Sequence, residues 1–224
     1  MNMLQCFLKS LFLCLVFIGF SQAKAGAYED FFRAVRIDDV RTVRQLLARG
    51  FDPNTLDENK RTGLMLAVAE PDPSPRVAEL LIGQLGIQID AVNPAGENAL
   101  MLAALRGHEV LVKSLLERGA EVNKPGWTAL HYAATGGHVA VMRRLLDRYA
   151  FLDAESPNGT TPLMMAAQYG STEAVKLLLE EGALPELRNQ LGLTALDFAR
   201  QGNRPDAIRL LSEALKPDKP SSIH

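Results

Sequence analysis

The chain has 224 residues, of which 47% are hydrophobic and 22% charged, and its formal net charge is −2 at pH 7. A chain of this length buries a substantial hydrophobic core. The balanced charge, without a basic tract, excludes the electrostatic footprint of a nucleic-acid-binding protein.

The first 25 residues predict a cleaved signal peptide. Lys9 gives a positive start, an apolar run follows from Leu11 to Phe20, and Ala23 and Ala25 are small residues of the kind that a signal peptidase reads. The apolar run is about half as long as the ~20 residues that a membrane-spanning helix needs. We therefore expect cleavage after Ala25 instead of a retained anchor, and export to the periplasm first or to the outside of the cell second.

Cleavage would remove both cysteines, Cys6 and Cys14, together with two lysines. The remaining chain carries 22 basic and 26 acidic residues, a net charge of −4. An exported protein without disulfides is held together by packing alone.

One short phrase recurs five times. It begins with Thr or Asn at positions 62, 98, 128, 161 and 194, which are 36, 30, 33 and 33 residues apart, and continues through Leu to an Ala, which a second Ala follows in three of the five. A leucine pair follows each phrase: Leu80-Leu81, Leu115-Leu116, Leu145-Leu146, Leu178-Leu179 and Leu210-Leu211. This pattern resembles the ankyrin repeat family, in which each repeat is a turn followed by two helices. The resemblance implies an all-α solenoid of stacked helix–turn–helix units joined by short β-hairpin turns.

In chain order we expect an ankyrin repeat domain over 26–216 and a disordered tail over 217–224. The domain divides into about six units, over 28–54, 55–90, 91–123, 124–153, 154–186 and 187–216. The second unit has three prolines between Pro71 and Pro75, which exclude a helical interior at that connection.

The fourth unit departs from the others at both ends. Only five residues lead from Asn123 to Thr128, three fewer than in the fifth unit, and this short hairpin carries Trp127, the only tryptophan. At the exit of the second helix, Tyr149 stands where other units have Gly50, Gly119 and Gly182. A left-handed helix cap is therefore costly at Tyr149.

Three histidines, His108, His131 and His138, invite a metal or catalytic interpretation. Packed helices lie about 8–10 Å apart, whereas metal ligands lie about 2 Å from one ion. The family resemblance implies instead that these histidines bond to backbone groups between units. Because the sequence also has no G-x-S-x-G motif and no phosphate-binding glycine loop, we expect no enzyme activity, no metal and no cofactor.

The ankyrin resemblance also implies that a protein partner binds a concave face formed by hairpin tips and inner helices. On this chain the candidate contact residues are Trp127, Tyr169, Arg106, Glu97, Leu105, Thr135, Asn158, Thr160, Gln168, Leu191 and Leu193. Trp, Tyr and Arg dominate interface energetics. Two placements of Trp127 remain open: its ring points into the groove, or it folds back over the space left by the missing residues.

These features predict an exported, non-catalytic module that binds a protein partner as an inhibitor, protector or accessory of an exported enzyme or toxin. We expect neither nucleic-acid binding nor stable membrane insertion after cleavage. The alternative is a self-associating or structural envelope protein, which a homodimer in light scattering would favour. A third option is a small-molecule site near Trp127 and Tyr169.

Overall fold

The computed structural model describes residues 26–69 and 74–216. The predicted signal peptide over 1–25 and the predicted tail over 217–224 lie outside the described residues. The same is true of residues 70–73, which include most of the proline-rich connection in the second unit.

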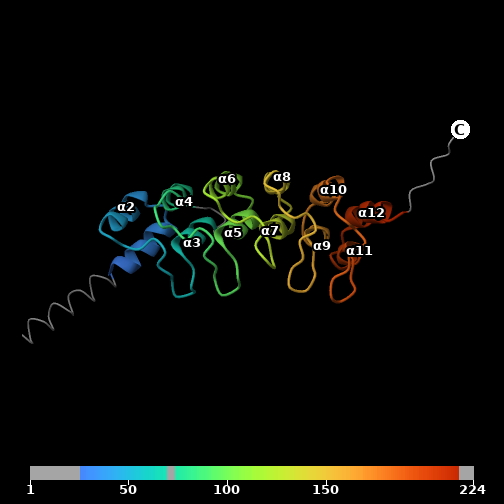
Figure 1. The fold of residues 1–224 in the computed structure, drawn as a ribbon, viewed down its shortest axis with the longest axis horizontal. Helices are drawn as coiled ribbons and strands as arrows, with labels where there is room; N and C mark the ends of the chain where they lie inside the picture. The colour runs from blue at the N-terminus through green and yellow to red at the C-terminus, as the bar shows by residue number, and fades with distance from the viewer. Residues whose placement is uncertain (1–25, 70–73, 217–224) are drawn as a thin grey trace, which may run out of the picture.

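Helices of the described ranges come in pairs, each with an inner and an outer member. The first pair is a helix over residues 26–36 and α2 (Val40–Ala48). The following pairs are α3 (Gly63–Ala69) with α4 (Pro75–Ile82), α5 (Ala99–Arg106) with α6 (Glu109–Glu117), α7 (Ala129–Gly136) with α8 (Val139–Leu146), α9 (Pro162–Gln168) with α10 (Thr172–Glu180), and α11 (Ala195–Gln201) with α12 (Pro205–Ala214). Figure 1 shows inner and outer helices in two parallel rows, with the hairpins projecting to one side. The predicted all-α stack of helix pairs is confirmed.

From α3 onward, each inner helix begins directly after the Thr or Asn of the recurring phrase. The Asn98 side chain accepts a hydrogen bond from the Met101 N–H at 3.0 Å, and Thr161 Oγ1 accepts one from the Met164 N–H at 3.4 Å. Such a cap satisfies a backbone donor that the helix itself leaves unpaired. The Thr or Asn of the phrase is thus the N-cap, and it sets where each of these helices starts.

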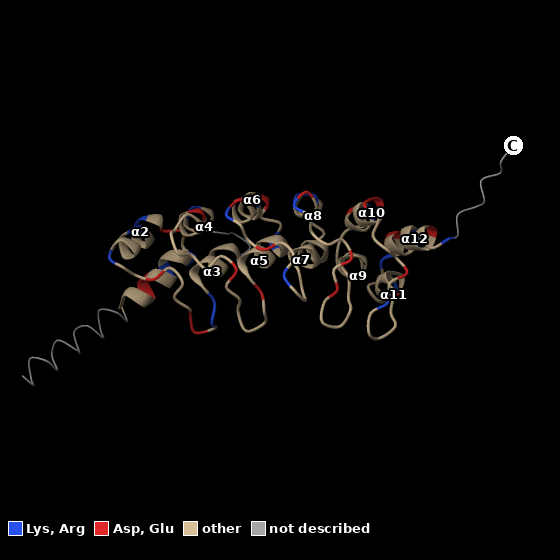
Figure 2. Ribbon diagram, viewed as in Figure 1, with Lys and Arg blue, Asp and Glu red and all other residues tan. Residues whose placement is uncertain are grey.

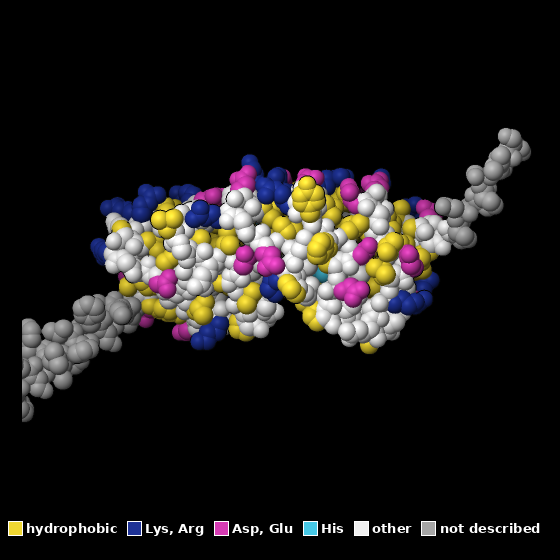
Figure 3. Space-filling view, in the orientation of Figure 1, with side chains coloured by type: hydrophobic (Ala, Val, Ile, Leu, Met, Phe, Trp, Pro, Cys, Tyr) yellow, Lys and Arg dark blue, Asp and Glu magenta, His cyan; other side chains and the backbone are white. Residues whose placement is uncertain are grey.

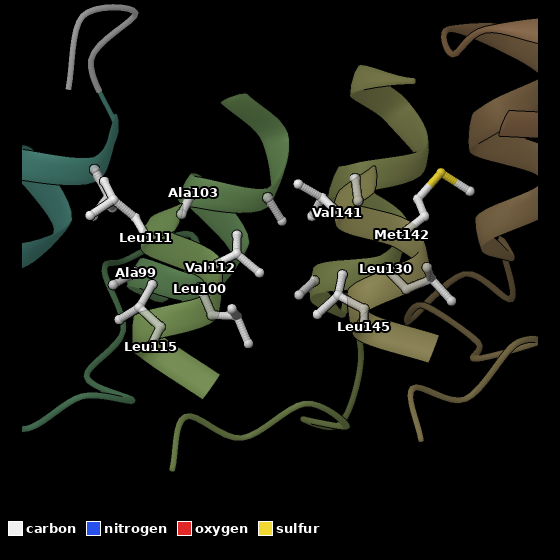
Figure 4. Packing of buried hydrophobic residues seen from close by; sticks show 14 of the residues in the cluster. Ala99, Leu100, Ala103, Leu111, Val112, Leu115, Leu130, Val141, Met142 and Leu145 are labelled. Atoms are coloured by element: carbon white, nitrogen blue, oxygen red, sulfur yellow. The ribbon is translucent and has the colours of Figure 1, made fainter. Parts of the chain in front are cut away.

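The core runs continuously through the stack. Leu100 on α5 and Leu130 on α7 are buried between the inner row and the outer row, where Leu115 and Leu145 meet them from α6 and α8 (Figure 4). Small residues such as Ala103 let neighbouring inner helices approach closely. Burial of each leucine contributes about 1.5–3 kcal/mol, and because each unit packs only on its neighbours, these contributions accumulate along the stack.

Charged side chains lie mainly on the outer helices and the connecting loops (Figure 2). The inner helices α3, α7 and α9 contain no Asp, Glu, Lys or Arg. The inner row is thus the packed layer of the stack. None of the helices in the described ranges has the length and apolar character needed to span a membrane.

Candidate protein-interaction face

Four of the hairpin tips are closed by the same device. In the third unit, Asn93 Oδ1 accepts from the Ala95 N–H at 2.9 Å and the Glu97 N–H at 3.0 Å, while the Asn93 N–H donates to the Glu97 carbonyl at 3.0 Å. The corresponding acceptors in other units are Asp57, Ser156 and Asn189. A tip held by several internal hydrogen bonds is ordered before a partner arrives, so less conformational entropy is lost on binding. We call the tips and the inner helices together the hairpin face.

Little of the predicted β character occurs in these connections. The structure has an isolated antiparallel bridge between Leu56 and Thr62, and the tips are otherwise turns stabilised by the side-chain acceptors just described. Each of these four tips also has one backbone hydrogen bond across it, from the N–H of the acceptor residue to the carbonyl four residues later.

The hairpin of the fourth unit, residues 124–127, lacks this closing device. It turns at Gly126, whose φ of 86° is in the left-handed region, and a Cβ atom placed there would lie 3.6 Å from the Pro157 ring of the next tip. Figure 1 shows this loop as shorter than those on either side, and Figure 3 shows an indentation of the outline there. The short hairpin thus produces a notch between longer tips.

Trp127 lies at this notch and is half-buried. Its ring meets the His131 ring edge to face, with 5.1 Å between ring centroids and 74° between ring planes. The indole therefore contacts the histidine of its own unit. Part of the ring stays accessible, so the interface role of Trp127 remains a prediction.

His131 connects the fourth unit to the fifth. Its Nδ1 accepts from the Thr128 N–H at 3.2 Å, and its Nε2 lies 2.9 Å from the Thr160 carbonyl oxygen, so Nε2 carries the proton. Burial lowers the pKa of His131 from 6.5 to about 4, so the ring is neutral at pH 7. His138 Nε2 similarly lies 2.9 Å from the Leu105 carbonyl oxygen. The predicted structural role of these two histidines is confirmed.

Metal binding finds no support in residues 26–69 and 74–216. Nowhere in these ranges do three or more His, Cys, Asp or Glu side chains gather closely enough to hold an ion.

The structure separates the eleven predicted contact residues by exposure. The exposed ones are Arg106, Asn158, Tyr169 and Leu191, and the half-buried ones are Trp127, Glu97, Leu105, Thr135, Gln168 and Leu193. Thr160 is only 2% exposed, so placing its side chain at an accessible tip was wrong. Thr160 stands at the base of its hairpin, where its N–H bonds to Ser156 and its carbonyl to His131.

Several polar candidates already have partners inside the stack. Arg106 Nε donates to the Ala69 carbonyl at 2.8 Å, satisfying the end of α3. Thr135 Oγ1 donates to the His131 carbonyl at 2.8 Å. The apolar candidates Tyr169 and Leu191 remain exposed, and they offer more surface to a partner than these polar groups do.

Glu97 takes part in a contact that sequence reasoning missed. Its carboxylate accepts from the Tyr132 hydroxyl at 2.9 Å and from Asn93 Nδ2 at 2.8 Å. Burial, followed by the bond to Glu97, raises the pKa of Tyr132. The two residues stand 35 positions apart, about one repeat, which is the signal that could have indicated the pair.

Comparison with protein families identifies the class. A family model describing three copies of the ankyrin repeat matches residues 31–124, 64–156 and 150–221. The chain therefore belongs to the ankyrin repeat family. This fold is in general a non-catalytic scaffold for protein–protein interaction.

Two solved structures are similar over most of the chain. The ankyrin repeat domain of human ASB11 gives a TM-score of 0.73 at 27% identity and covers 84% of each chain. A chain in the complex of the predatory endopeptidase Bd0816 of Bdellovibrio bacteriovorus with the immunity protein Bd3460 gives a TM-score of 0.70 at 26% identity. That match covers 82% of the present chain and 97% of the other.

Curated relatives match over a shorter segment. The rat and mouse ankyrin repeat and SAM domain-containing protein 6 are each 39% identical over 88 residues, which is 39% of this chain and 9% of theirs. This similarity is confined to a small part of those proteins, so it does not extend their activities to this chain.

Proposed function

We propose that this protein is an exported, non-catalytic ankyrin repeat module that binds another exported protein through its hairpin face and inhibits or protects it. The observation that carries the proposal is the notch of the fourth unit, where a shortened hairpin places the half-buried Trp127 between longer tips. Ordered tips beside a recessed aromatic side chain form a surface suited to a protruding loop of a partner.

The partner class that we favour is an exported hydrolase such as an endopeptidase. Similarity to a chain in an endopeptidase–immunity protein complex supports this class, because the match covers nearly all of that chain. The predicted signal peptide over residues 1–25 supports an encounter in the periplasm. Binding at the mouth of the partner's active site would block its substrate without any chemistry in the ankyrin stack.

Apolar side chains are expected to supply most of the binding energy. Trp127, Tyr169 and Leu191 present accessible apolar surface, whereas Arg106 and Glu97 already have internal hydrogen-bond partners. Aromatic residues near the centre of an interface commonly cost 2 kcal/mol or more, roughly a 30-fold loss in affinity, when truncated to alanine.

The test is capture of partners from an envelope extract with the wild type and Trp127→Ala in parallel. We expect the wild type to retain a hydrolase whose activity falls as purified ankyrin protein is added at equimolar amounts, with at least a tenfold weaker effect of Trp127→Ala. Equal thermal midpoints for the two proteins would show that the substitution acts on the surface.

Two outcomes would count against the proposal. One is a captured hydrolase whose activity does not change on addition of the protein. The other is a stable homodimer in light scattering at low micromolar concentration, which would favour self-association instead.

A further inference from the structure

The exit of α8 is held in a backbone conformation that its side chain disfavours. Tyr149 has a φ of 62°, whereas Gly119 and Gly182 occupy the same place in the units on either side. Its N–H nevertheless donates to the Leu146 carbonyl at 2.9 Å, as Gly119 and Gly182 donate to the corresponding leucines. The left-handed cap thus forms despite the Cβ atom, at a conformational cost of roughly 1 kcal/mol or more.

This strained residue does not use its ring to fill a core. Tyr149 is 84% exposed, and Phe151, two residues later, is 63% exposed. Strain retained at an exposed aromatic side chain is the kind of outlier that indicates a function other than stability.

The exposed apolar surface extends into the fifth unit. Phe151 has the same place in the fourth unit as Glu121 in the third and Leu184 in the fifth, and Leu184 is 46% exposed. We call Tyr149, Phe151 and Leu184 the exit patch. It contains none of the residues proposed for the hairpin face, because it lies where outer helices end.

Hydrogen bonds to the backbone fix the exit patch in place. Asn123 Oδ1 accepts from the Phe151 N–H at 2.8 Å, and Asn123 Nδ2 donates to the Tyr149 carbonyl at 2.7 Å. The Asp153 carboxylate accepts from the Leu184 N–H at 3.2 Å. The apolar side chains are therefore presented from a rigid backbone and need little ordering on binding.

The surroundings of the exit patch are predominantly acidic. Exposed carboxylates flank it in the third, fourth and fifth units, as Glu121, Glu155, Glu181 and Glu186. Burial and the nearby Glu186 raise the pKa of Asp153, against the lowering effect of the bond from Leu184.

Basic groups near the exit patch are fewer. Arg118 donates to the Gln84 carbonyl and Arg188 to the Gly192 carbonyl, and both keep their positive charge. The three stretches that carry the patch and its equivalents, 117–124, 147–155 and 180–188, together contain eight Asp or Glu and four Lys or Arg. Figure 3 shows hydrophobic side chains over and below α8, with both acidic and basic side chains beside them.

We propose that the exit patch is a second docking surface, which takes a basic segment of a protein partner carrying an aromatic or aliphatic side chain between Lys or Arg residues. The apolar side chain packs on Tyr149, Phe151 and Leu184, and the flanking cations meet the carboxylates around them. Charge complementarity steers the encounter and aligns the segment, while the aromatic pair supplies the contact area. The proposal is independent of the hairpin face.

The test uses a variant that copies the neighbouring unit. Tyr149→Gly with Phe151→Glu turns the exit of the fourth unit into that of the third, Gly119-Ala120-Glu121, and leaves every backbone hydrogen bond available. We expect the double variant to fold with an unchanged or higher thermal midpoint. Trp127→Ala serves as the matched control on the hairpin face.

The probe is a random 12-residue peptide display library selected on the full wild-type chain, followed by synthesis of the enriched peptide. We expect an aromatic or aliphatic residue flanked by Lys or Arg, affinity at least tenfold weaker for the double variant and unchanged for Trp127→Ala, and weaker binding at high salt. No enrichment, enrichment without basic residues, or equal affinity for the double variant would each overturn the proposal.

Sedimentation velocity on the same proteins tests a different occupant. A dimer of the wild type that disappears in the double variant would show that a second copy of the chain covers the exit patch, and would also overturn the proposal. If the proposed function of the hairpin face were wrong, by contrast, this would be seen only in the experiments with Trp127→Ala and the captured hydrolase.

Discussion

The third and fourth units share a core but differ at both ends. Leu100 and Leu130 are equivalent and fully buried, yet the third unit has a closed tip at Asn93 and a glycine exit at Gly119, whereas the fourth unit has neither. The difference shows that packing between layers is determined by a few apolar positions, which leaves the tip and the exit free to change. Each departure has an accessible aromatic residue, the half-buried Trp127 at the tip and the exposed Tyr149 at the exit, and this is where we place partner binding.

The largest expected effect concerns the hydrophobic core that the third and fourth units share. Leu100→Ala and Leu130→Ala should each lower the free energy of unfolding by about 3–4 kcal/mol, because both remove a buried side chain from an interface between layers. Urea unfolding followed by circular dichroism measures the loss. A loss at Leu130 below half that at Leu100 would mean that the core of the fourth unit is also irregular.

Of the third and fourth units, only the fourth should show the pH-dependent effect of a buried histidine in this position, where the third has Met101. Burial lowers the pKa of His131 from 6.5 to about 4. Between pH 6.5 and pH 4 the histidine therefore binds a proton in the unfolded chain but not in the folded chain. Stability from this residue is complete above pH 6.5 and falls as the pH drops toward 4. We expect it to contribute a loss of about 2–3 kcal/mol in the free energy of unfolding between pH 7.5 and 4.5.

The matched control is His131→Met, because Met101 and Met164 occupy this position in the third and fifth units. Carboxylates titrate equally in both proteins, so urea unfolding at the two pH values isolates the histidine by difference. An identical pH response of the wild type and His131→Met would contradict the assignment.

Giving the fourth unit a tip of regular length should weaken partner binding at the hairpin face. Replacing residues 124–127 with residues 154–160 adds three residues and the Ser156 acceptor, and removes Trp127. We expect affinity for the captured partner to fall at least tenfold, equivalent to about 1.4 kcal/mol, with little change in thermal midpoint. Titration calorimetry measures the affinity, and binding at wild-type strength would exclude the notch from the interface.

The smallest expected effect concerns the anchor beneath the exit patch. Asn123→Asp keeps the acceptor for the Phe151 N–H but loses the donor to the Tyr149 carbonyl, so unfolding should become easier by about 1 kcal/mol. Asn123→Ala, which loses both bonds, should cost more in the same urea experiment. If Asn123→Asp were as stable as the wild type, the amide donor would have no role.

Sequence reasoning recovered the elements that depend on local chemistry. The Thr or Asn positions at which inner helices start, the leucine pairs of which the core buries at least one member and the shortened hairpin all follow from spacing and side-chain type. Contacts between units were harder to predict. Three features depend on how far each repeat unit is offset from the next, which a repeat period does not specify. They are the Glu97–Tyr132 hydrogen bond, the burial of Thr160 and the two hydrogen bonds of Asn123.

The cost of a left-handed cap at Tyr149 followed from the residue type alone. Sequence could not show that the cap forms anyway, since the outcome depends on the Leu146 carbonyl and on Asn123 in the preceding unit. The exposure of Phe151 was likewise hidden, because a hydrophobic residue after a helix is ordinarily read as part of the core.

The Asn123 amide forms hydrogen bonds with the main chain on both sides of Ala150, and neither bond involves the side chains at 149 and 151. Different residues can therefore stand at position 151, and at a conformational cost at position 149, while the backbone that carries them stays the same. Specificity at such a position can drift by single substitutions, so related proteins facing other partners should diverge here before they diverge in the leucines beneath.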